Sequence, residues 1–344
     1  MQLWLDAVLI VVAAVLLDRF VGEPPNRFHP LRWIGNTVGF LDRRVKDRAT
    51  KANRLWGALS YVFVFLLFWL ATLAICTALR YYVPGTFAIG TLESSWGEVL
   101  WILASAAAFK LSFAVFSFRS HCIPIQKDLL EGRTEDAAAK VQMIVSRDTR
   151  GMDAEHIASS CCETVSENLV DSVVSPAAYF GILGVMGAVM FRCANLMDAM
   201  WGYLNDEYRH LGFFPAKFDD VLGYVTSRAS PAFVAVAAWI LRMNYKGVIA
   251  AARAEHGKTP SPNSGWPMTA VAAALGISME KKGVYVMGGG PMPSAEDVTR
   301  CCRLVEAASL IFIFAVTLPL YALIGIHVQT FVEEAFHGFL EALF

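Results

Sequence analysis

Three carboxylates in the middle of the chain are spaced one helical turn apart. Glu163, Glu167 and Asp171 stand at i, i+4 and i+8, so an α-helix would stack them along one face. Like charges at this spacing repel, and Mg²⁺ held by carboxylates and a phosphate is the usual cation that offsets the repulsion. A solvated acidic face would show the same spacing. Because the cluster runs directly into an apolar segment, where carboxylates are costly, a functional site is the stronger interpretation.

Two further groups of polar residues follow. Asn195 and Asp198 are three residues apart and share a helical face, and the Asp219-Asp220 pair stands just before an apolar run. An ordinary acidic helix N-terminus would look like that pair. The stretch 256–267 contains Gly-Lys-Thr, but it lacks the first glycine of a P-loop and its prolines oppose the helix that a P-loop needs. It is better interpreted as a stiff polar loop that holds an anion by backbone donors, or as a plain connector.

The sequence lacks the motifs that are typical of several other reaction classes. The sequence has no H-E-x-x-H and no G-x-S-x-G pattern, so a membrane metalloprotease or a serine hydrolase has no support. Its seven cysteines form no C-x-x-C pair, which excludes a thioredoxin-like motif and predicts reduced thiols, mostly on helices. A formal net charge of -1 provides no field that would attract nucleic acid, so no nucleic-acid partner is expected.

The elements that must hold these residues are membrane helices. Hydrophobic residues make up 56% of the 344 residues and charged residues only 17%, both shifted from soluble averages toward a membrane protein. The sequence predicts a single all-α, polytopic membrane domain over residues 1–344, with helices and loops at the cytoplasmic face. The expected spans are 3–22, 55–79, 99–118 and 305–327, and two interrupted segments, 172–191 and 221–241, either both span or both fail to span.

Loop charge predicts the orientation in the cell membrane. The loops 23–54, 119–171 and 242–303 are rich in Lys and Arg and should be cytoplasmic, whereas the loop 81–97 has neither and should be external, as should both ends of the chain. The first apolar segment lacks a basic leader and a cleavage site, so a retained helix is expected there. Capping patterns at Thr134 and Ser294 predict helix starts, and strand signals are few.

Many of these motifs occur together in one order along most of the chain. They are Asp18-x-x-x-Gly22-Glu23-Pro24-Pro25, His29-Pro30, Ser146-Arg147-Asp148-Thr149, Glu163-x-x-x-Glu167-Asn168-x-x-Asp171, Asn195-x-x-Asp198-x-Met200-x-Gly202, Asp219-Asp220, Arg228, and His256 with Ser261-Pro262-Asn263-Ser264-Gly265. This set resembles the CobD/CbiB family of cobalamin biosynthesis, the adenosylcobinamide-phosphate synthases. The sequence departs from the family pattern over 279–288, around Tyr285.

The resemblance implies a ligation that depends on ATP and Mg²⁺. The propionate carboxylate of adenosylcobyric acid, a corrinoid substrate, would be joined to the amine of (R)-1-amino-2-propanol phosphate or of threonine phosphate. ATP would convert the poorly electrophilic carboxylate into an acyl phosphate, which the amine attacks. The implied metal ligands are Glu163, Glu167, Asp171 and Asp198. The implied catalytic residues are Arg147, Asp148, Asp219, Asp220 and His256, and the implied ligand-binding residues are Ser146, Thr149, Asn168, Asn195, Arg228, Ser261, Asn263 and Gly265.

The ligase hypothesis also predicts how the chain is arranged in the membrane. ATP is cytoplasmic, so the stretch 192–220 should reach the inner face or lie buried at membrane depth, and 172–191 is expected to be a broken or re-entrant helix. Membrane lipid is an expected partner, and the hypothesis allows a homo-oligomer or a complex with other membrane proteins of cobalamin biosynthesis.

Three other functions are alternatives to the ligase. A non-enzymatic relative such as the AmpE-like sensor proteins would not need the carboxylates that this chain retains. A corrinoid transporter or scaffold would use intramembrane carboxylates as a route, whereas here they gather with a stiff polar loop. A prenyltransferase would need a D-D-x-x-D pattern, which the sequence lacks.

Overall fold

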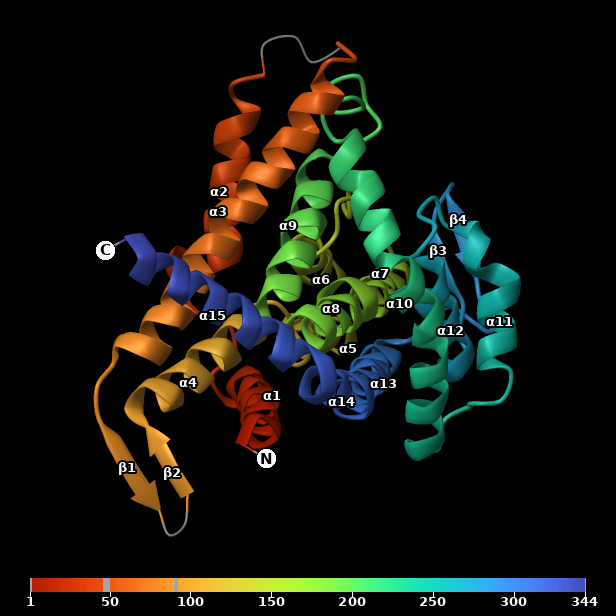
Figure 1. Ribbon diagram of the computed structural model, residues 1–344. Helices are drawn as coiled ribbons and strands as arrows, with labels where there is room; N and C mark the ends of the chain where they lie inside the picture. The colour runs from red at the N-terminus through yellow and green to blue at the C-terminus, as the bar shows by residue number, and fades with distance from the viewer. Residues whose placement is uncertain (1, 46–49, 90–91, 344) are drawn as a thin grey trace. The chain divides into compact units, whose positions relative to one another are not determined.

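The computed structural model describes residues 2–45, 50–89 and 92–343, and these are mostly helical with very little strand (Figure 1). The predicted all-α class is therefore confirmed. Contacts along the chain divide it into two compact units, one of residues 1–113, 176–221 and 314–344, and the other of residues 114–175 and 222–313. Part of the predicted basic loop 23–54, residues 46–49, lies outside the described residues.

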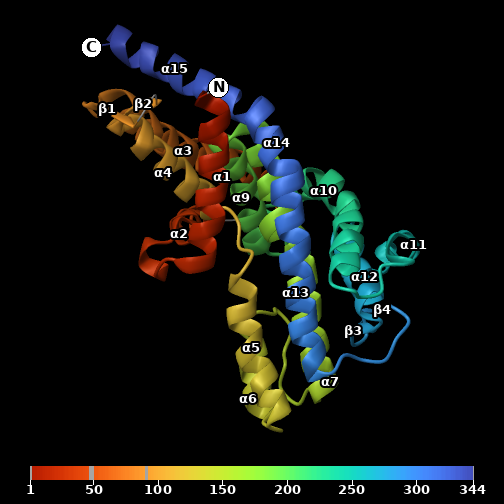
Figure 2. The ribbon, with the colours of Figure 1, turned by 90° about the horizontal axis from the view of Figure 1, so that it is seen from below.

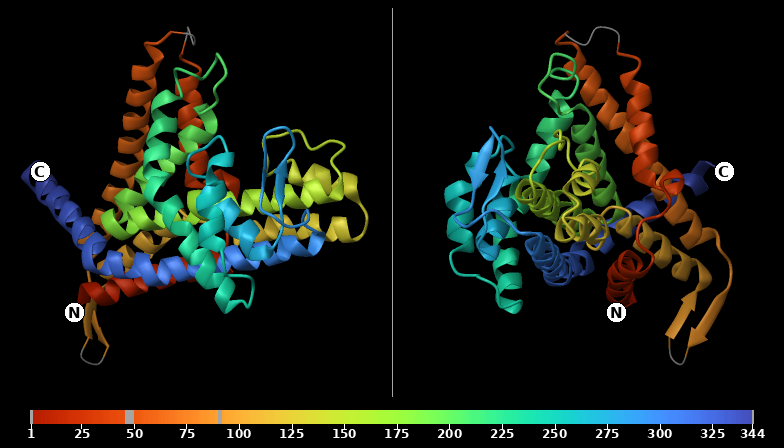
Figure 3. Two further views of the ribbon diagram at one scale, coloured as in Figure 1. Left: turned by 90° about the vertical axis from the view of Figure 1, so that its right-hand side faces the viewer. Right: turned by 180° about the vertical axis from the view of Figure 1, so that it is seen from behind.

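The first unit is built from long helices and one short hairpin. Its elements are α1 (Gln2–Phe20), a 3-10 turn η1 (Asn26–Phe28), α2 (Pro30–Asp42), α3 (Asn53–Tyr82), β1 (Thr86–Ile89), β2 (Leu92–Ser95), α4 (Trp96–Lys110), most of α8 (Ser175–Leu183), α9 (Val185–Trp201), the start of α10 (Phe213–Ile240), α14 (Leu318–Leu320), a π-helical turn η5 (Tyr321–Gly325) and α15 (Ile326–Leu343). Strands β1 and β2 pair antiparallel between α3 and α4. Helices α2 and α3 run side by side, in red and orange in Figure 3.

The second unit packs helices around α7. Its elements are α5 (Ser117–Leu130), α6 (Thr134–Val141), α7 (Ala154–Leu169), a π-helical turn η2 (Val170–Val174), the rest of α10, α11 (Val248–Glu255), a 3-10 turn η3 (His256–Lys258), α12 (Gly265–Leu275), β3 (Met279–Lys281), β4 (Tyr285–Met287) and α13 (Ala295–Phe312). Helix α13, which continues through a further π-helical turn η4 (Ile313–Thr317), lies beside α5 and α7 (Figure 2). The predicted start at Ser294 is confirmed by a capping box with Asp297, and α6 begins at Thr134 as expected.

Three continuous helical stretches among the described residues are long and apolar enough to cross a membrane: Asn53–Tyr82, Phe213–Ile240 and Ala295–Leu343. They contain the predicted spans 55–79 and 305–327 and nearly all of the segment 221–241. The protein thus has the character of an all-α polytopic membrane protein. Helix α1 forms as predicted, but it carries Asp6, Asp18 and Arg19 and is not among the three.

The predicted span 99–118 is wrong as a single helix. Helix α4 ends at Lys110, and α5 begins only at Ser117. The ammonium of Lys110 is buried and lies 3.4 Å from Asp18 and 2.8 Å from Glu23, and Glu23 is also 2.8 Å from His29. This ion cluster fixes the end of α4 against the loop after α1, so the polar Asp18–His29 motif has a structural role.

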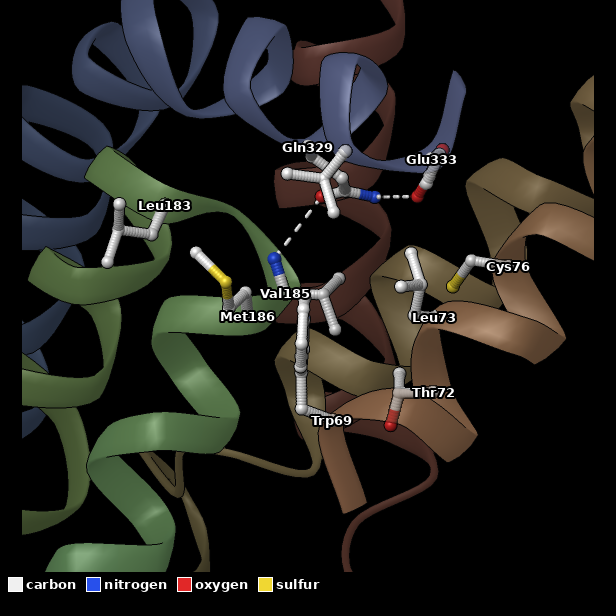
Figure 4. A pocket seen from close by; sticks show the side chains of 10 residues that line it. Trp69, Thr72, Leu73, Cys76, Leu183, Val185, Met186, Gln329 and Glu333 are labelled. Carbon is white, nitrogen blue, oxygen red and sulfur yellow. Dashed lines mark hydrogen bonds between the residues drawn. The ribbon is translucent and has the colours of Figure 1, made fainter. Parts of the chain in front are cut away.

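The interrupted segment 172–191 is broken, as expected. Residue Gly184 has a left-handed φ of 63° between α8 and α9, and a Cβ there would lie 2.6 Å from Gln329 Oε1. The Val185 N–H, freed by the break, donates to that oxygen at 3.3 Å (Figure 4). Gln329 also donates to Glu333, which pairs with Arg80 at 3.3 Å. The adjoining cavity of about 20 Å³ has room for about one water, so this network supports the helix break rather than a ligand.

Candidate active site

Glu163, a predicted metal ligand, is fully engaged in hydrogen bonds and an ion pair. Its side chain is 3% exposed on α7 and accepts hydrogen bonds from Arg147 at 2.6 Å, Tyr285 at 2.7 Å and Ser159 at 2.8 Å. Both carboxylate oxygens are therefore occupied, and the guanidinium neutralises the charge. Because a metal ion would have to displace these donors, Glu163 does not fit the role of a magnesium ligand in this arrangement.

Tyr285 was not among the predicted site residues. The short hairpin of β3 and β4 brings it to Glu163, and the hairpin is held to α7 by the Glu280 N–H, which donates to Ser159 Oγ at 2.9 Å. Burial and the negative charge of Glu163 raise the pKa of Tyr285 well above its ordinary value, so it is a firm hydrogen-bond donor. One sequence signal near this residue was the departure from the family pattern.

The other two carboxylates of the predicted triad are half-buried. Glu167 lies on α7, but Asp171 lies in the π-helical turn η2, which adds a residue to the helical turn and changes the i+8 register. Asn168, between them, bonds to Thr164 and Ser172 of the same helical run. Among the described residues, no three His, Cys, Asp or Glu side chains are placed to hold a metal ion alone. Glu167 and Asp171 still fit Mg²⁺ that takes most of its ligands from phosphate and water.

The Ser146–Thr149 motif forms an ordered loop. Thr149 is buried and donates to Ala138 O at 2.8 Å, and its N–H donates to Gln142 at 3.1 Å. Asp148 is exposed and pairs with Arg150, which lowers the pKa of Asp148 to about 2. A wide hollow of about 870 Å³ adjoins the loop and is lined in part by Ser146, Asp148 and Thr149.

The predicted polar loop 256–267 packs on α10 within the second unit. Asn263 Oδ1 accepts from Ser227 at 3.2 Å and from Arg228 at 3.3 Å, and Ser261 Oγ accepts from the Asn263 N–H at 3.2 Å. A Cβ on Gly265 would lie 2.0 Å from the His256 carbonyl oxygen, so glycine is required there. The loop is thus ordered rather than a loose connector.

A second pair of carboxylates lies in the first unit. Asp198 on α9 and Asp219 on α10 repel one another, and Asn195 donates to Asp219. The Oδ1 atom of Asp219 is buried without a hydrogen-bond donor among the described residues. Burial and the charge of Asp220 raise the pKa of Asp198 to about 6, while Lys217, which pairs with Asp220 at 2.9 Å, opposes the shift.

Gly202 leaves room for the side chain of Asp198 at the end of α9. A Cβ at this residue would lie 2.1 Å from Asp198 Oδ1, so only glycine leaves room for the carboxylate at the end of α9. Asn195 and Asp198, which the sequence treated separately from Asp219 and Asp220, interact with these two carboxylates within one unit. The structure gives Asp198 carboxylate neighbours from α10. The shared metal site with the α7 carboxylates stays a prediction.

Such a pair of carboxylates suits a cation or an added proton. Two carboxylates that repel one another, one of them with an oxygen that lacks a donor, favour a bound ammonium group or an added proton. A carboxylate with a pKa near 6 is mostly ionised at neutral pH, but it accepts a proton more readily than an ordinary aspartate. The arrangement can therefore bind an amine in its ammonium form and remove a proton from it.

Proteins with similar sequences belong to the same family that the motifs indicate. The sequence matches the CobD/Cbib protein family over residues 11–305. It is 35% identical over 284 residues to the probable cobalamin biosynthesis protein CobD of Methanothermobacter thermautotrophicus, covering 83% of this chain and 88% of the relative. It is 31% identical to the cobalamin biosynthesis protein CobD of Dehalococcoides mccartyi, covering 90% and 96%, and 34% identical to that of Chromobacterium violaceum, covering 88% and 93%.

The long apolar helices and these matches together define a helical membrane protein of the cobalamin-biosynthesis class. The chain belongs to the CobD/CbiB family. No solved structure matches it.

Proposed function

We propose that this protein is an ATP-dependent ligase that makes an adenosylcobinamide phosphate. It would join the propionate carboxylate of adenosylcobyric acid to the amine of (R)-1-amino-2-propanol phosphate or of threonine phosphate. Membership of the CobD/CbiB family indicates a role in cobalamin biosynthesis. The specific ligation and its substrates are our inference from that role and from the chemistry of the site.

The observation that carries the proposal is the Asp198–Asp219 pair. An amine arrives at neutral pH as an ammonium ion and cannot attack a carbonyl until it loses a proton. The donorless oxygen of Asp219 suits the ammonium, and Asp198, with its raised pKa, suits the removal of the proton. The proton would rest on Asp198 while the amide bond forms.

ATP and Mg²⁺ complete the proposed reaction. When bound, ATP supplies the phosphoryl group that turns the carboxylate into a good electrophile. Glu167 and Asp171 would hold Mg²⁺, because Mg²⁺ in phosphoryl-transfer sites usually takes one or two protein carboxylates and keeps phosphate and water as its other ligands. Arg147 and Tyr285 would hold Glu163 in a fixed, neutralised state beside them.

The direct test is ligation by the purified protein in detergent. The assay contains adenosylcobyric acid, aminopropanol phosphate, ATP and Mg²⁺, and the amide product is detected by its mass. We expect product that requires ATP, and threonine phosphate in parallel identifies the preferred amine. Folded protein that forms no product with either amine would contradict the ligase and favour the non-enzymatic alternative.

The pH dependence of ligation should report the pKa of Asp198. Because the active form of Asp198 is the carboxylate, kcat/KM for the amine should fall as the pH drops through about 6. Asp220→Asn removes the neighbouring negative charge and should move this acidic limb of the pH profile of kcat/KM to lower pH. Lys217→Met removes the neighbouring positive charge and should move the limb to higher pH.

These opposite shifts are measured from kcat/KM profiles at saturating ATP. Asp206→Asn is the matched control, because that side chain is 96% exposed and should leave the limb in place. Shifts in the same direction for Asp220→Asn and Lys217→Met would contradict the assignment of the limb to Asp198.

A further inference from the structure

Arg228 is a basic residue within one of the stretches apolar enough to span a membrane. It lies near the middle of α10, Phe213–Ile240, and in the described part of the chain its hydrogen-bond acceptors are uncharged oxygens rather than carboxylates. An ionisable side chain at such a place is costly unless it is paired or serves a ligand. Because no carboxylate in the described part of the chain neutralises its charge, an anion bound by the protein would do so.

The guanidinium group is nevertheless held in place. Its Nη1 atom donates to the Tyr224 carbonyl at 2.8 Å, and to Ser227 Oγ and Asn263 Oδ1 at 3.3 Å each. Its Cζ atom lies over the Tyr224 ring, 3.4 Å from the ring centre, and 5.3 Å from the ring centre of Trp266. The Trp266 ring is in turn stacked on His256 at 4.0 Å.

These contacts leave one edge of the guanidinium available. Stacking uses its faces, and all three hydrogen bonds use one nitrogen, so Nε and Nη2 make no hydrogen bond to the described residues. Two parallel N–H groups on one edge of a fixed, charged plane match two oxygens of a phosphate group. Because the geometry is fixed before binding, little conformational entropy is lost when the anion arrives.

The loop beside Arg228 adds favourable charge. Asn263, which contacts the guanidinium, stands two residues before the first residue of α12, Gly265–Leu275, so the partly positive N-terminus of that helix begins close to it. A Cβ on Gly223 would lie 2.7 Å from Asn263 Nδ2, which shows how closely the loop approaches α10. The Ser261–Gly265 motif thus holds the acceptor that orients Arg228.

We propose that the Arg228 edge binds a phosphate group of a ligation substrate. The proposal rests on the proposed function, in which two of the three substrates, ATP and the phosphorylated amine, carry phosphate. Tyr224, Asn263 and Trp266 act as positioning residues that keep the guanidinium plane fixed. The shared chemistry is a phosphate recognised by a planar fork, and the experiment identifies its source.

The test compares Arg228→Gln and Arg228→Lys with the wild-type protein. KM is measured separately for ATP, aminopropanol phosphate and adenosylcobyric acid, each with the other two saturating. We expect Arg228→Gln to raise KM for one of the two phosphate-bearing substrates about 10- to 100-fold. Arg228→Lys keeps the charge but loses the fork and should recover only part of the affinity. Whichever of the two KM values rises identifies the source of the phosphate.

A binding measurement keeps this test separate from the ligase proposal. Inorganic phosphate is titrated into the detergent-purified protein and followed by ³¹P line broadening, which needs no turnover. Broadening that is lost in Arg228→Gln would support the phosphate site even if no ligation is found.

Arg253→Gln is the matched control, since Arg253 is an exposed arginine on α11 of the same unit and its loss should change neither measurement. Three results would overturn the proposal. They are a rise confined to KM for adenosylcobyric acid, which would indicate a carboxylate site, no effect in a folded Arg228→Gln variant, and an equal effect of Arg253→Gln.

Discussion

Asp198→Asn is expected to lower kcat/KM for the amine about 10²- to 10⁴-fold, the usual contribution of a positioned general base. Asparagine has nearly the same shape but cannot accept the ammonium proton. Asp219→Asn should chiefly raise KM for the amine, because it removes the charge that attracts the ammonium group. Both are measured in the ligation assay at neutral pH with saturating ATP.

A change of nucleophile separates loss of the base from general damage to the site. Hydroxylamine is largely neutral near pH 7, so it depends less on a base to become nucleophilic. The loss caused by Asp198→Asn should therefore be much smaller with hydroxylamine than with aminopropanol phosphate. Equal losses with both nucleophiles would contradict the role of Asp198 as the base, whereas Asp206→Asn should behave as wild type with both.

The helices were predictable where composition alone determines them. The long apolar stretches of α3 and α13–α15 and the capping box at Ser294 are local properties of the sequence, and each is observed. The break at Gly184 was also predictable, because glycine and proline interrupt 172–191. The end of α4 at Lys110 was not predictable, since it depends on Asp18 and Glu23, which are about ninety residues away in the chain.

The candidate site was predictable in its residue types but not in its pairings. The i, i+4, i+8 rule assumes a regular helix, and the π-helical turn after Leu169 breaks that regularity at Asp171. The three donors on Glu163 come from a loop, from α7 and from a hairpin of three-residue strands, and a hairpin that short leaves little pattern in the sequence. Only through-space contact between helices pairs Asp198 with Asp219, so no spacing rule could have assigned the pair.

Arg147→Met is expected to lower the free energy of unfolding by about 3–5 kcal/mol, the usual cost of leaving a buried charge without its partner. Glu163 is 3% exposed and Arg147 is 17% exposed, so the carboxylate loses far more than the guanidinium when the pair is broken. Glu163→Gln should therefore lower the free energy of unfolding less than Arg147→Met does, because the unpaired Arg147 guanidinium retains access to water. The measurement is equilibrium unfolding of the detergent-solubilised protein.

A double variant of Arg147 and Glu163 tests this prediction most directly. Arg147→Met combined with Glu163→Gln removes the buried charge together with its partner, and it should be more stable than Arg147→Met alone. Arg150→Met is the matched control, since the Arg150–Asp148 pair in the same loop is exposed and its loss should leave unfolding unchanged. A double variant less stable than Arg147→Met would mean that the Glu163 carboxylate is stabilised chiefly by Tyr285 and Ser159. In that case Tyr285→Phe, rather than Arg147→Met, should be the most destabilising single change in the cluster.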